Sequence, residues 1–468
     1  MIRDQDTVNA TAIEAAGITF FPTQKNSLNQ MSRKILQDRN FASYIKKLFQ
    51  CDIVNLSENR AACHTAFRAI NPNDFVKNSL LKIKLLSNQI REKKFLFDVK
   101  DIVNIGIGGS DLGPKLICEV GENLQSGPKP HFVSNLDTSQ IHGVLKNLSP
   151  ENTLFIITSK SFNTLETLEN FKVAQQWFFD HKVNAENHFI AVTNNIHTVK
   201  QLNIFKDNVF MLPDWIGGRF SIWSAVGLII AISFGFSHFH QLHQGAYEMD
   251  QHFYHTDFER NMPVVYAAEL YRALIQNDIK TLAVLPYAHQ LQTLPAYLQQ
   301  LIMESLGKNV NTQGEKITSS TGPIVFGSTG TSSQHSFQQM MMQGTHRFMA
   351  DFILPLTETK MIINCLTQVK TLRHGAPHSE LLKNISGNQL VNLFVLKSLD
   401  LKTLGALLAF YEHAVVTTAF LMDINPFDQF GVEYAKTASD QLRVKFPNTI
   451  PTLENIKTIL TIDHCDPI

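Results

Sequence analysis

A repeated alternation of short, continuously apolar runs with helix-like segments constrains the fold of this chain more than any other feature. The first series contains five runs spaced roughly 20 to 35 residues apart, at residues 102–107, 131–134, 153–158, 189–192 and 209–212. Most of these intervals leave room for the crossover helix that parallel strands require. Apolar strands joined in this way predict a parallel sheet that is covered by helices on both faces.

A second series of the same kind begins near residue 280. We expect three strands separated by helices, with the strands at residues 281–285, 324–326 and 352–354 and the helices at residues 297–306 and 334–343. Residues 390–421 are predicted to form one long helical region, and residues 432–442 a further helix. The second series therefore repeats the architecture of the first.

The predicted fold class is α/β, with two doubly wound parallel-sheet domains flanked by helical N- and C-terminal segments. We place an N-terminal helical segment at residues 1–85, the first α/β domain at 86–240, the second at 241–388 and a C-terminal helical segment at 389–468. In such sheets ligands bind beyond the carboxyl ends of the strands. Most of the motifs described below lie at those ends.

Composition excludes several classes of protein. The 468 residues are 44% hydrophobic and 18% charged, and 41 Lys and Arg balance 41 Asp and Glu. These fractions exclude a disordered, collagen-like or small disulfide-scaffold protein, and zero net charge argues against a nucleic-acid partner.

The N-terminus has no signal-like apolar run, and the apolar residues 220–236 suit a buried core helix better than a membrane span. We therefore expect a cytoplasmic protein with no membrane partner.

The cysteines and histidines do not predict a metal site. Five scattered cysteines are expected to be thiols in a reducing compartment: Cys51, Cys63, Cys118, Cys365 and Cys465. Neither an HExxH motif nor a Cys/His cluster is found. The histidine-bearing residues 237–243 are interpreted as a solvated loop after the buried helix.

Two segments at predicted strand ends carry the groups that bind a phosphate. The glycine-rich residues 106–113 allow close approach of the backbone to an anion and include the hydroxyl of Ser110. A second segment opens a predicted helix with three hydroxyls and one ammonium, from Ser159, Lys160, Ser161 and Thr164. The alternative for this second segment is a helix cap with a solvated lysine. A dinucleotide site is disfavoured because Asp111 replaces the last glycine of GxGxxG.

Four further segments carry candidate acid, base or charge-stabilising groups. Arg219 follows two glycines, where it is either an ion-pair partner or a stabiliser of negative charge on oxygen. Gln300 and Glu304 are four residues apart and are expected to share one helix face, with Glu304 either exposed or in a partly dry cleft. His335 lies near a helix start, and Gln429 and Lys436 are seven residues apart. Each of these residues, taken alone, also suits a purely structural role.

In combination, these segments resemble one known family. Residues 214–227 and 419–436 resemble the two signature regions of the glucose-6-phosphate isomerase (phosphoglucose isomerase) family. The glycine-rich, serine-rich, Glu304 and His335 segments match the same family in the same order. The stretch Glu-Asn-Arg-Ala-Ala-Cys-His-Thr-Ala-Phe-Arg at residues 58–68 also resembles a family motif. The resemblance covers about residues 55–440.

The resemblance implies a role for each matching position. It assigns the sugar phosphate to Ser110, Ser159, Lys160, Ser161 and Thr164, and further substrate contacts to Gln300 and Gln429. It implies that Glu304 is the catalytic base, that Arg219 stabilises the enediolate and that His335 and Lys436 open the sugar ring. Glu166 occupies a position that orients the histidine.

The resemblance also implies the wider setting of the activity. The family fold has two sugar-isomerase α/β domains, and its members act on a small-molecule sugar phosphate without a cofactor or metal. They are usually homodimers with shared active sites, so His335 is expected to come from the neighbouring subunit.

This sequence departs from the family pattern at a few positions. Leu306 replaces an asparagine, Ser332 and Ser333 replace Asn-Gly, and Phe220 replaces a tyrosine. None of these changes removes a proton-transfer group. Two rival functions remain open from the sequence, namely a non-catalytic sugar-phosphate sensor and a dinucleotide-dependent oxidoreductase.

Overall fold

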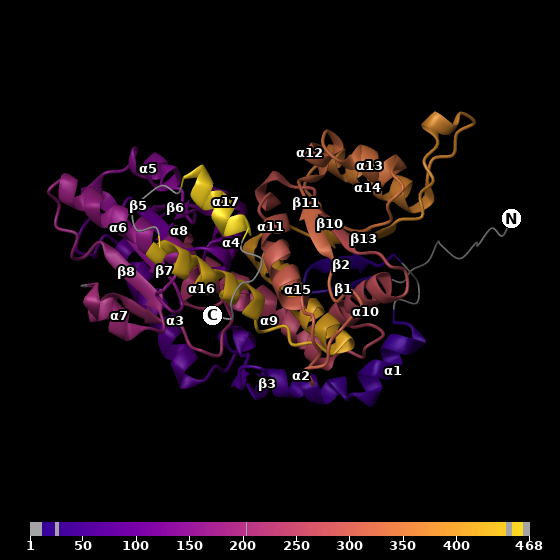
Figure 1. The fold of residues 1–468 in the computed structure, drawn as a ribbon, viewed down its shortest axis with the longest axis horizontal. Coiled ribbons are helices and arrows are strands. Elements are labelled where there is room, and N and C mark those ends of the chain that lie inside the picture. The colour runs from indigo at the N-terminus through magenta and orange to yellow at the C-terminus, as the bar shows by residue number, and fades with distance from the viewer. Residues whose placement is uncertain (1–11, 24–27, 203, 446–451, 462–468) are drawn as a thin grey trace. The chain divides into compact units, whose positions relative to one another are not determined.

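The computed structural model describes residues 12–23, 28–202, 204–445 and 452–461. The chain divides into two compact units, Met1–Pro426 and Phe427–Ile468. The first unit contains all of the described strands, in two larger sheets and one short hairpin (Figure 1). The fold is α/β with parallel sheets, as the alternation of apolar runs predicts.

The first sheet is five-stranded and entirely parallel, with the order β6-β5-β7-β8-β9. Its strands are β5 (Asp101–Ile105), β6 (Lys129–Val133), β7 (Thr153–Thr158), β8 (Phe189–Thr193) and β9 (Val209–Met211). The connecting helices are α4 (Leu112–Val120), α5 (Ser139–Leu145), α6 (Leu165–Asp180) and α7 (Ile196–Gln201). All five strands predicted from the first series are confirmed. The strand order reverses between β5 and β7, which is where sheets of this topology bind ligands.

The second sheet has six strands in the order β1-β2-β13-β12-β10-β11. Four are parallel: β10 (Thr281–Pro286), β11 (Ile324–Gly327), β12 (Met349–Pro355) and β13 (Leu390–Leu396). The other two, β1 (Ile13–Ala15) and β2 (Ile18–Phe21), form an antiparallel hairpin, and β2 pairs with β13. Figure 1 shows this N-terminal hairpin beside strand β13 from the far end of the sequence. The helices of this sheet are α11 (Leu294–Leu298), α12 (Gly330–Gln334), α13 (Gln338–Gln343) and α14 (Thr359–His374).

The prediction of a continuous helical region at residues 390–421 is wrong over its first part. Leu390–Leu396 is the buried strand β13, and the helix α15 (Leu401–Met422) begins only after it. A continuous apolar run does not distinguish a buried strand from a buried helix, and sheet pairing decided the outcome here. The second sheet therefore takes strands from outside the predicted range 241–388. The division of the chain into four segments stays a prediction.

Long buried helices form the core of the first unit. Helix α15 packs against α9 (Phe236–His255) and α10 (Met262–Ile275). Among the described residues, α15 alone is long and apolar enough to cross a membrane, but 94% of its most apolar window is buried inside the protein. Burial of this kind is typical of a core helix.

Residues 220–236 do not form the single helix that their composition predicts. Only Leu228–Phe234, helix α8, is α-helical, and two short 3₁₀ turns, Gly218–Phe220 and Ala225–Gly227, precede it. Serine hydroxyls bond to nearby carbonyl groups in this segment, with the Ser224 hydroxyl donating to the Ser221 carbonyl oxygen. Such local bonds compete with a continuous helix.

The predicted solvated loop at residues 237–243 is also wrong, because this stretch lies within α9. His243 is buried, and its two ring nitrogens lie 2.8 Å from the carbonyl oxygens of Phe239 and Trp223. Burial lowers the pKa of His243 to about 4, so the ring is neutral at pH 7 and donates its single N–H to one of these two carbonyl oxygens.

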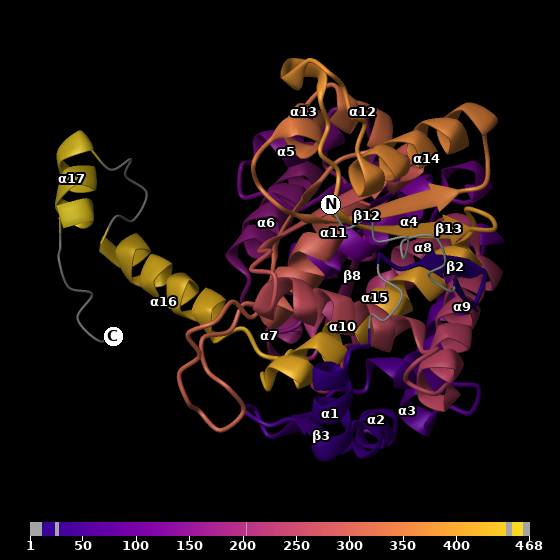
Figure 2. The same cartoon turned by 90° about the vertical axis from the view of Figure 1, so that its right-hand side faces the viewer.

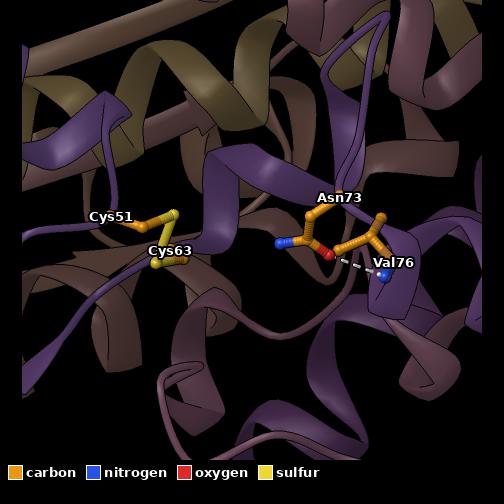
Figure 3. The surroundings of a disulfide bond; sticks show 4 residues. All are labelled: Cys51, Cys63, Asn73 and Val76. Carbon is orange, nitrogen blue, oxygen red and sulfur yellow. Dashed lines mark hydrogen bonds between the residues drawn. A yellow bond between two sulfur atoms is a disulfide. The ribbon is translucent and has the colours of Figure 1, made fainter.

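The N-terminal part of the first unit contains α1 (Gln30–Asp38), α2 (Phe41–Phe49), the hairpin of β3 (Ile53–Asn55) and β4 (Arg60–Ala61), and α3 (Asp74–Arg91). Figure 3 shows the start of α3, where the Asn73 side chain accepts a hydrogen bond of 3.0 Å from the Val76 amide. It also shows a disulfide between Cys51 and Cys63, which closes the hairpin.

The prediction of five free thiols is therefore wrong for Cys51 and Cys63. The β3–β4 hairpin brings their Cα atoms to 5.1 Å, a pairing that a spacing of twelve residues does not reveal. Cys118 and Cys365 are buried free thiols. Cys465 lies outside the described residues.

The second unit consists of helices, visible in Figure 2 as α16 (Phe430–Lys445) and α17 (Leu453–Thr461). The helix predicted at residues 432–442 is confirmed as part of α16. Lys436 lies in this helix with an exposed side chain, whereas Gln429 immediately precedes it.

Candidate active site

The two predicted phosphate-binding segments follow β5 and β7, the neighbouring strands at which the strand order reverses. Asn104, inside β5, connects the ends of these strands. Its amide nitrogen donates to the Ser110 carbonyl oxygen at 2.9 Å, and its amide oxygen accepts from the Thr158 hydroxyl at 3.1 Å. The sequence analysis did not single out Asn104, although a polar residue inside an apolar strand is a detectable signal. This bonding holds both loops at the carboxyl edge of the sheet.

The loop after β7 is folded around the hydroxyl of Ser159. This oxygen lies 3.0 Å from the Thr164 hydroxyl and accepts a 3.1 Å hydrogen bond from the Phe162 amide. Phe162 is buried with a φ of 55°, so its backbone makes a tight left-handed turn. Ser161 is exposed on the same turn. The turn gathers hydroxyl groups ahead of α6, whose N-terminal dipole favours an anion.

Lys160 is not the solvated lysine of the alternative interpretation. Its ammonium donates hydrogen bonds of 2.8 Å and 2.9 Å to the carbonyl oxygens of Asp214 and Ile216. Burial, together with the positive charge of Arg60, lowers the pKa of Lys160 to about 8. Lys160 thus ties the loop after β7 to the segment that leads to Arg219.

The glycine-rich turn after β5 is a packing surface for two other candidate residues. Gly108 has a φ of 61°, and a Cβ atom there would lie 2.8 Å from the Gln300 amide nitrogen. A Cβ atom on Gly109 would lie 2.0 Å from the carbonyl oxygen of Gly218, which directly precedes Arg219. Only glycine permits these approaches. The turn therefore brings Ser110, Gln300 and Arg219 into one region.

Arg219 and Glu304 form an ion pair in this region, with 3.1 Å between Nη1 and Oε1. The Arg219 side chain is 2% exposed, whereas that of Glu304 is 22% exposed. Arg219 also donates from Nε to the Ser305 hydroxyl at 2.7 Å and from Nη2 to the Pro426 carbonyl oxygen. The guanidinium is therefore held on several sides, while the carboxylate remains reachable from solvent. Ser305 was not predicted as a site residue.

Glu304 lies at the end of a π-helix, not on the α-helix that the sequence predicts for residues 297–306. The α-helical part, α11, ends at Leu298, and Gln299–Glu304 forms the wider π-helical turn. Short π-helical segments are frequent at functional sites. Gln300 and Glu304 are both partly buried.

Of the remaining predicted residues, His335 and Glu166 lie elsewhere in the first unit, and Gln429 and Lys436 lie in the second unit. His335 is exposed just after α12, and within the described chain no hydrogen bond or ion pair joins its ring to Glu304. Glu166 is half-buried in the first turn of α6. In the second unit, the Gln429 amide donates to Glu433 at 3.2 Å, and Lys436 is exposed.

The site thus combines a carboxylate paired with a fixed cation, a glycine-rich loop that carries Ser110 and a second loop that is rich in hydroxyl groups. A sequence model of the phosphoglucose isomerase family matches residues 23–451. The chain belongs to this family.

Relatives and solved structures agree with this assignment. The chain is 37% identical to a glucose-6-phosphate isomerase of Shewanella sediminis, over 90% of this chain and 87% of that protein. It is 39% identical to the glucose-6-phosphate isomerase of Coxiella burnetii, over 91% and 86% of the two chains. A crystal structure of a glucose-6-phosphate isomerase from Chlamydia trachomatis superimposes with a TM-score of 0.89 at 28% identity, covering 98% of this chain and 94% of that one.

Proposed function

We propose that this member of the phosphoglucose isomerase family interconverts glucose 6-phosphate and fructose 6-phosphate, in glycolysis and gluconeogenesis. The observation that carries this proposal is the 3.1 Å pair of Arg219 and Glu304 beside the two loops that we predict to bind the phosphate, at the reversal of strand order. An aldose–ketose isomerisation needs one base that moves a proton between adjacent carbons and one cation that stabilises charge on oxygen. The pair supplies both groups.

In the proposed mechanism, Glu304 removes the proton from C2 of the open-chain aldose. The electrons of the broken C–H bond form the C1–C2 double bond of a cis-enediol(ate), and Arg219 stabilises the negative charge on oxygen. Glu304 then returns the proton to C1, and a hydroxyl proton passes from O2 to O1, which yields the ketose. Since the proton leaves and returns through the same carboxylate, the reaction needs neither an oxidant nor a reductant.

The phosphate group anchors the substrate away from the reacting carbons. We assign it to the hydroxyl of Ser110, just before α4, and to Ser159, Lys160, Ser161 and Thr164, just before α6. Two of the three ammonium N–H groups of Lys160 donate to protein carbonyls, so Lys160 also holds the loop in position. The substrate contacts assigned to Gln300 and Gln429 complete this part of the proposal.

Ring opening requires a further acid–base pair, and we assign it to His335 and Lys436. His335 is exposed at the end of α12. We propose that the protein is a cytoplasmic homodimer in which each active site takes His335 from the other subunit. Glu166 would orient this histidine.

One assay tests the proposed function. The purified chain is incubated with glucose 6-phosphate alone, and fructose 6-phosphate is measured. We expect isomerisation without any added nucleotide or metal salt. Binding without turnover would favour the sugar-phosphate sensor, and a reaction that depends on added NAD or NADP would favour the oxidoreductase.

A further inference from the structure

A cavity lies at the opposite edge of the first sheet from the candidate active site. It has a volume of about 610 Å³ and is lined by residues of α3, by Ser126 and by the junction of α8 and α9. Ser126 lies shortly before β6, and α3 precedes β5, so these elements are near the amino ends of the strands. The active-site loops follow the carboxyl ends of β5 and β7. The cavity is therefore separate from the active site.

The lining of this cavity carries two cations and two histidines. Lys84 and Arg91 come from α3, and His238 and His240 come from α9. None of the ten described lining residues is Asp or Glu. The neighbouring carboxylate of Glu92 is already paired with Lys94 at 2.6 Å. The electrostatic character of the lining favours an anion.

Arg91 is fixed in place before any ligand arrives. Its Nη1 donates to the carbonyl oxygens of Ile232 and Ser233, both at 3.1 Å, and its Nη2 donates to the Ser126 hydroxyl at 2.8 Å. Gly235 lies against the guanidinium, and its φ of 98° is a backbone conformation that other residues rarely adopt. A preorganised cation loses little entropy when it binds an anion.

The start of α9 adds a second favourable feature. This helix has 20 residues, and its N-cap position is Gly235, which has no side chain to cap the first amide groups. The amides and the helix dipole at this end attract negative charge. They lie on the same side of the cavity as His238 and His240.

Aromatic rings give the cavity an apolar, planar component. Phe234 and Phe236 line it, and the ring of His240 stacks on Phe236 with an interplanar angle of 10°. The Lys84 ammonium lies 5.9 Å from the centre of the Phe236 ring. Phosphate-binding cations beside a flat apolar surface suit a ligand that combines an anion with a planar ring.

We infer that this cavity binds a phosphorylated compound with a planar ring, of the size of a mononucleotide. The volume lies within the range of small-molecule sites. The phosphate contacts Arg91, Lys84 and the N-terminus of α9, and the ring lies against Phe236. This inference does not depend on the proposed isomerase activity.

The test uses AMP as the probe and isothermal titration calorimetry of the full chain. We expect Lys84→Gln to weaken AMP binding about tenfold, because it removes a charge-assisted contact. Lys77→Gln is the matched control, since Lys77 is exposed on the same helix but does not line the cavity. Arg219→Met serves as the active-site control and is expected to leave AMP binding unchanged.

Two further probes test the ring and the phosphate of the ligand separately. Adenosine and inorganic phosphate are each expected to bind more weakly than AMP. The inference is overturned if wild-type protein shows no AMP binding, if Lys84→Gln binds AMP as well as wild type, or if Arg219→Met abolishes binding. It is also overturned if adenosine or inorganic phosphate alone binds as tightly as AMP.

Discussion

The guanidinium of Arg219 contacts the carboxylate of Glu304, with 3.1 Å between Nη1 and Oε1. This contact has a consequence for the proposed reaction. When Glu304 accepts a proton, it becomes neutral as negative charge develops on the substrate oxygen. Arg219 can then stabilise the charge on the substrate oxygen instead of the charge on Glu304. It needs no large movement to do so, because its other bonds, to Ser305 and Pro426, keep it in place.

Replacement of the base tests the central assignment. We expect Glu304→Gln to lower kcat by at least about 10²- to 10⁴-fold, the range associated with general base catalysis. Sugar-phosphate binding is expected to change little, because the phosphate loops are intact. Steady-state kinetics and calorimetric binding give the two values. Glu122→Gln, at an exposed position, is the control, and a fully active Glu304→Gln variant would refute the assignment.

Arg219 is expected to be irreplaceable by lysine. A lysine keeps the charge but lacks the planar fork that contacts Glu304, Ser305 and Pro426 together. Loss of such a stabilising group raises the barrier by about 3–4 kcal/mol, so we expect kcat to fall by roughly 10²- to 10³-fold in Arg219→Lys. Thermal unfolding of the same variant checks that it is folded. Near wild-type kcat in a folded Arg219→Lys would contradict this role.

The lowered pKa of Lys160 predicts that the affinity for the sugar phosphate depends on pH. Its pKa is lowered to about 8, so the ammonium loses its proton as the pH rises through that value. We expect the affinity for fructose 6-phosphate to fall between about pH 7 and pH 9, since a neutral amine attracts the phosphate less. In Lys160→Met, binding should be weaker and independent of pH in this window. An identical pH profile in the variant would show that Lys160 is not the group responsible.

The lowered pKa of Lys160 changes the stability of the fold with pH in the direction opposite to its effect on binding. The pKa of Lys160 is lower in the folded chain than the ordinary value of 10.5, so the unfolded chain binds this proton more tightly. The contribution of Lys160 to the free energy of unfolding therefore increases as the pH rises from about 8 to 10.5. Urea denaturation of wild type and Lys160→Met across this range measures the difference.

Mixed dimers test whether active sites are shared. Glu304→Gln and His335→Ala homodimers are each expected to be inactive. In a heterodimer, one site would combine an intact Glu304 with an intact His335, so random mixing should restore about a quarter of wild-type activity. The control mixes Glu304→Gln with a second inactive Glu304 variant, which has no intact site in any combination. No recovery after verified subunit exchange would argue that His335 acts within its own subunit.

A buried ion-pair cluster is expected to be essential for stability. Arg68 contacts Asp250 at 2.7 Å and Glu412 at 2.5 Å, and all three side chains are almost fully buried. Arg68→Met leaves two carboxylates without their cation, so we expect a loss of about 3–5 kcal/mol in the free energy of unfolding. Urea denaturation measures this loss. Adding Glu412→Gln should recover part of it, and strictly additive effects would contradict the coupling.

Strand β13 shows where sequence patterning reached its limit. The strands of the first series were predictable because each is a short apolar run bounded by turn residues. Residues 390–396 are equally apolar, but the helix α15 begins only a few residues later. Lys397, Ser398 and Asp400 separate the two elements, and the Asp400 side chain caps the start of α15, a boundary that the prediction of one continuous helix overlooked. Pairing with β12 and β2 makes the first part a strand.

The candidate site likewise contains some residues that the sequence predicts and others that only the structure reveals. The residue types and the order of Ser110, Arg219 and Glu304 were readable from the sequence. Ser305 was not, because its role depends on a hydrogen bond that only the folded chain forms. Asn104 left a signal as a polar residue inside an apolar strand, but its bonding partners are defined only in the folded chain. The disulfide between Cys51 and Cys63 is a comparable case, since the hairpin brings the two residues together.

The sequence by itself determined the α/β class and the candidate groups for anion binding and proton transfer. These depend on local patterns, namely apolar runs, glycine turns and polar residues at strand ends. Tertiary structure decided which groups meet, including the Arg219–Glu304 pair and the π-helical turn that carries the base. The physical reason is that contacts between distant segments depend on strand order and packing, which no local pattern encodes.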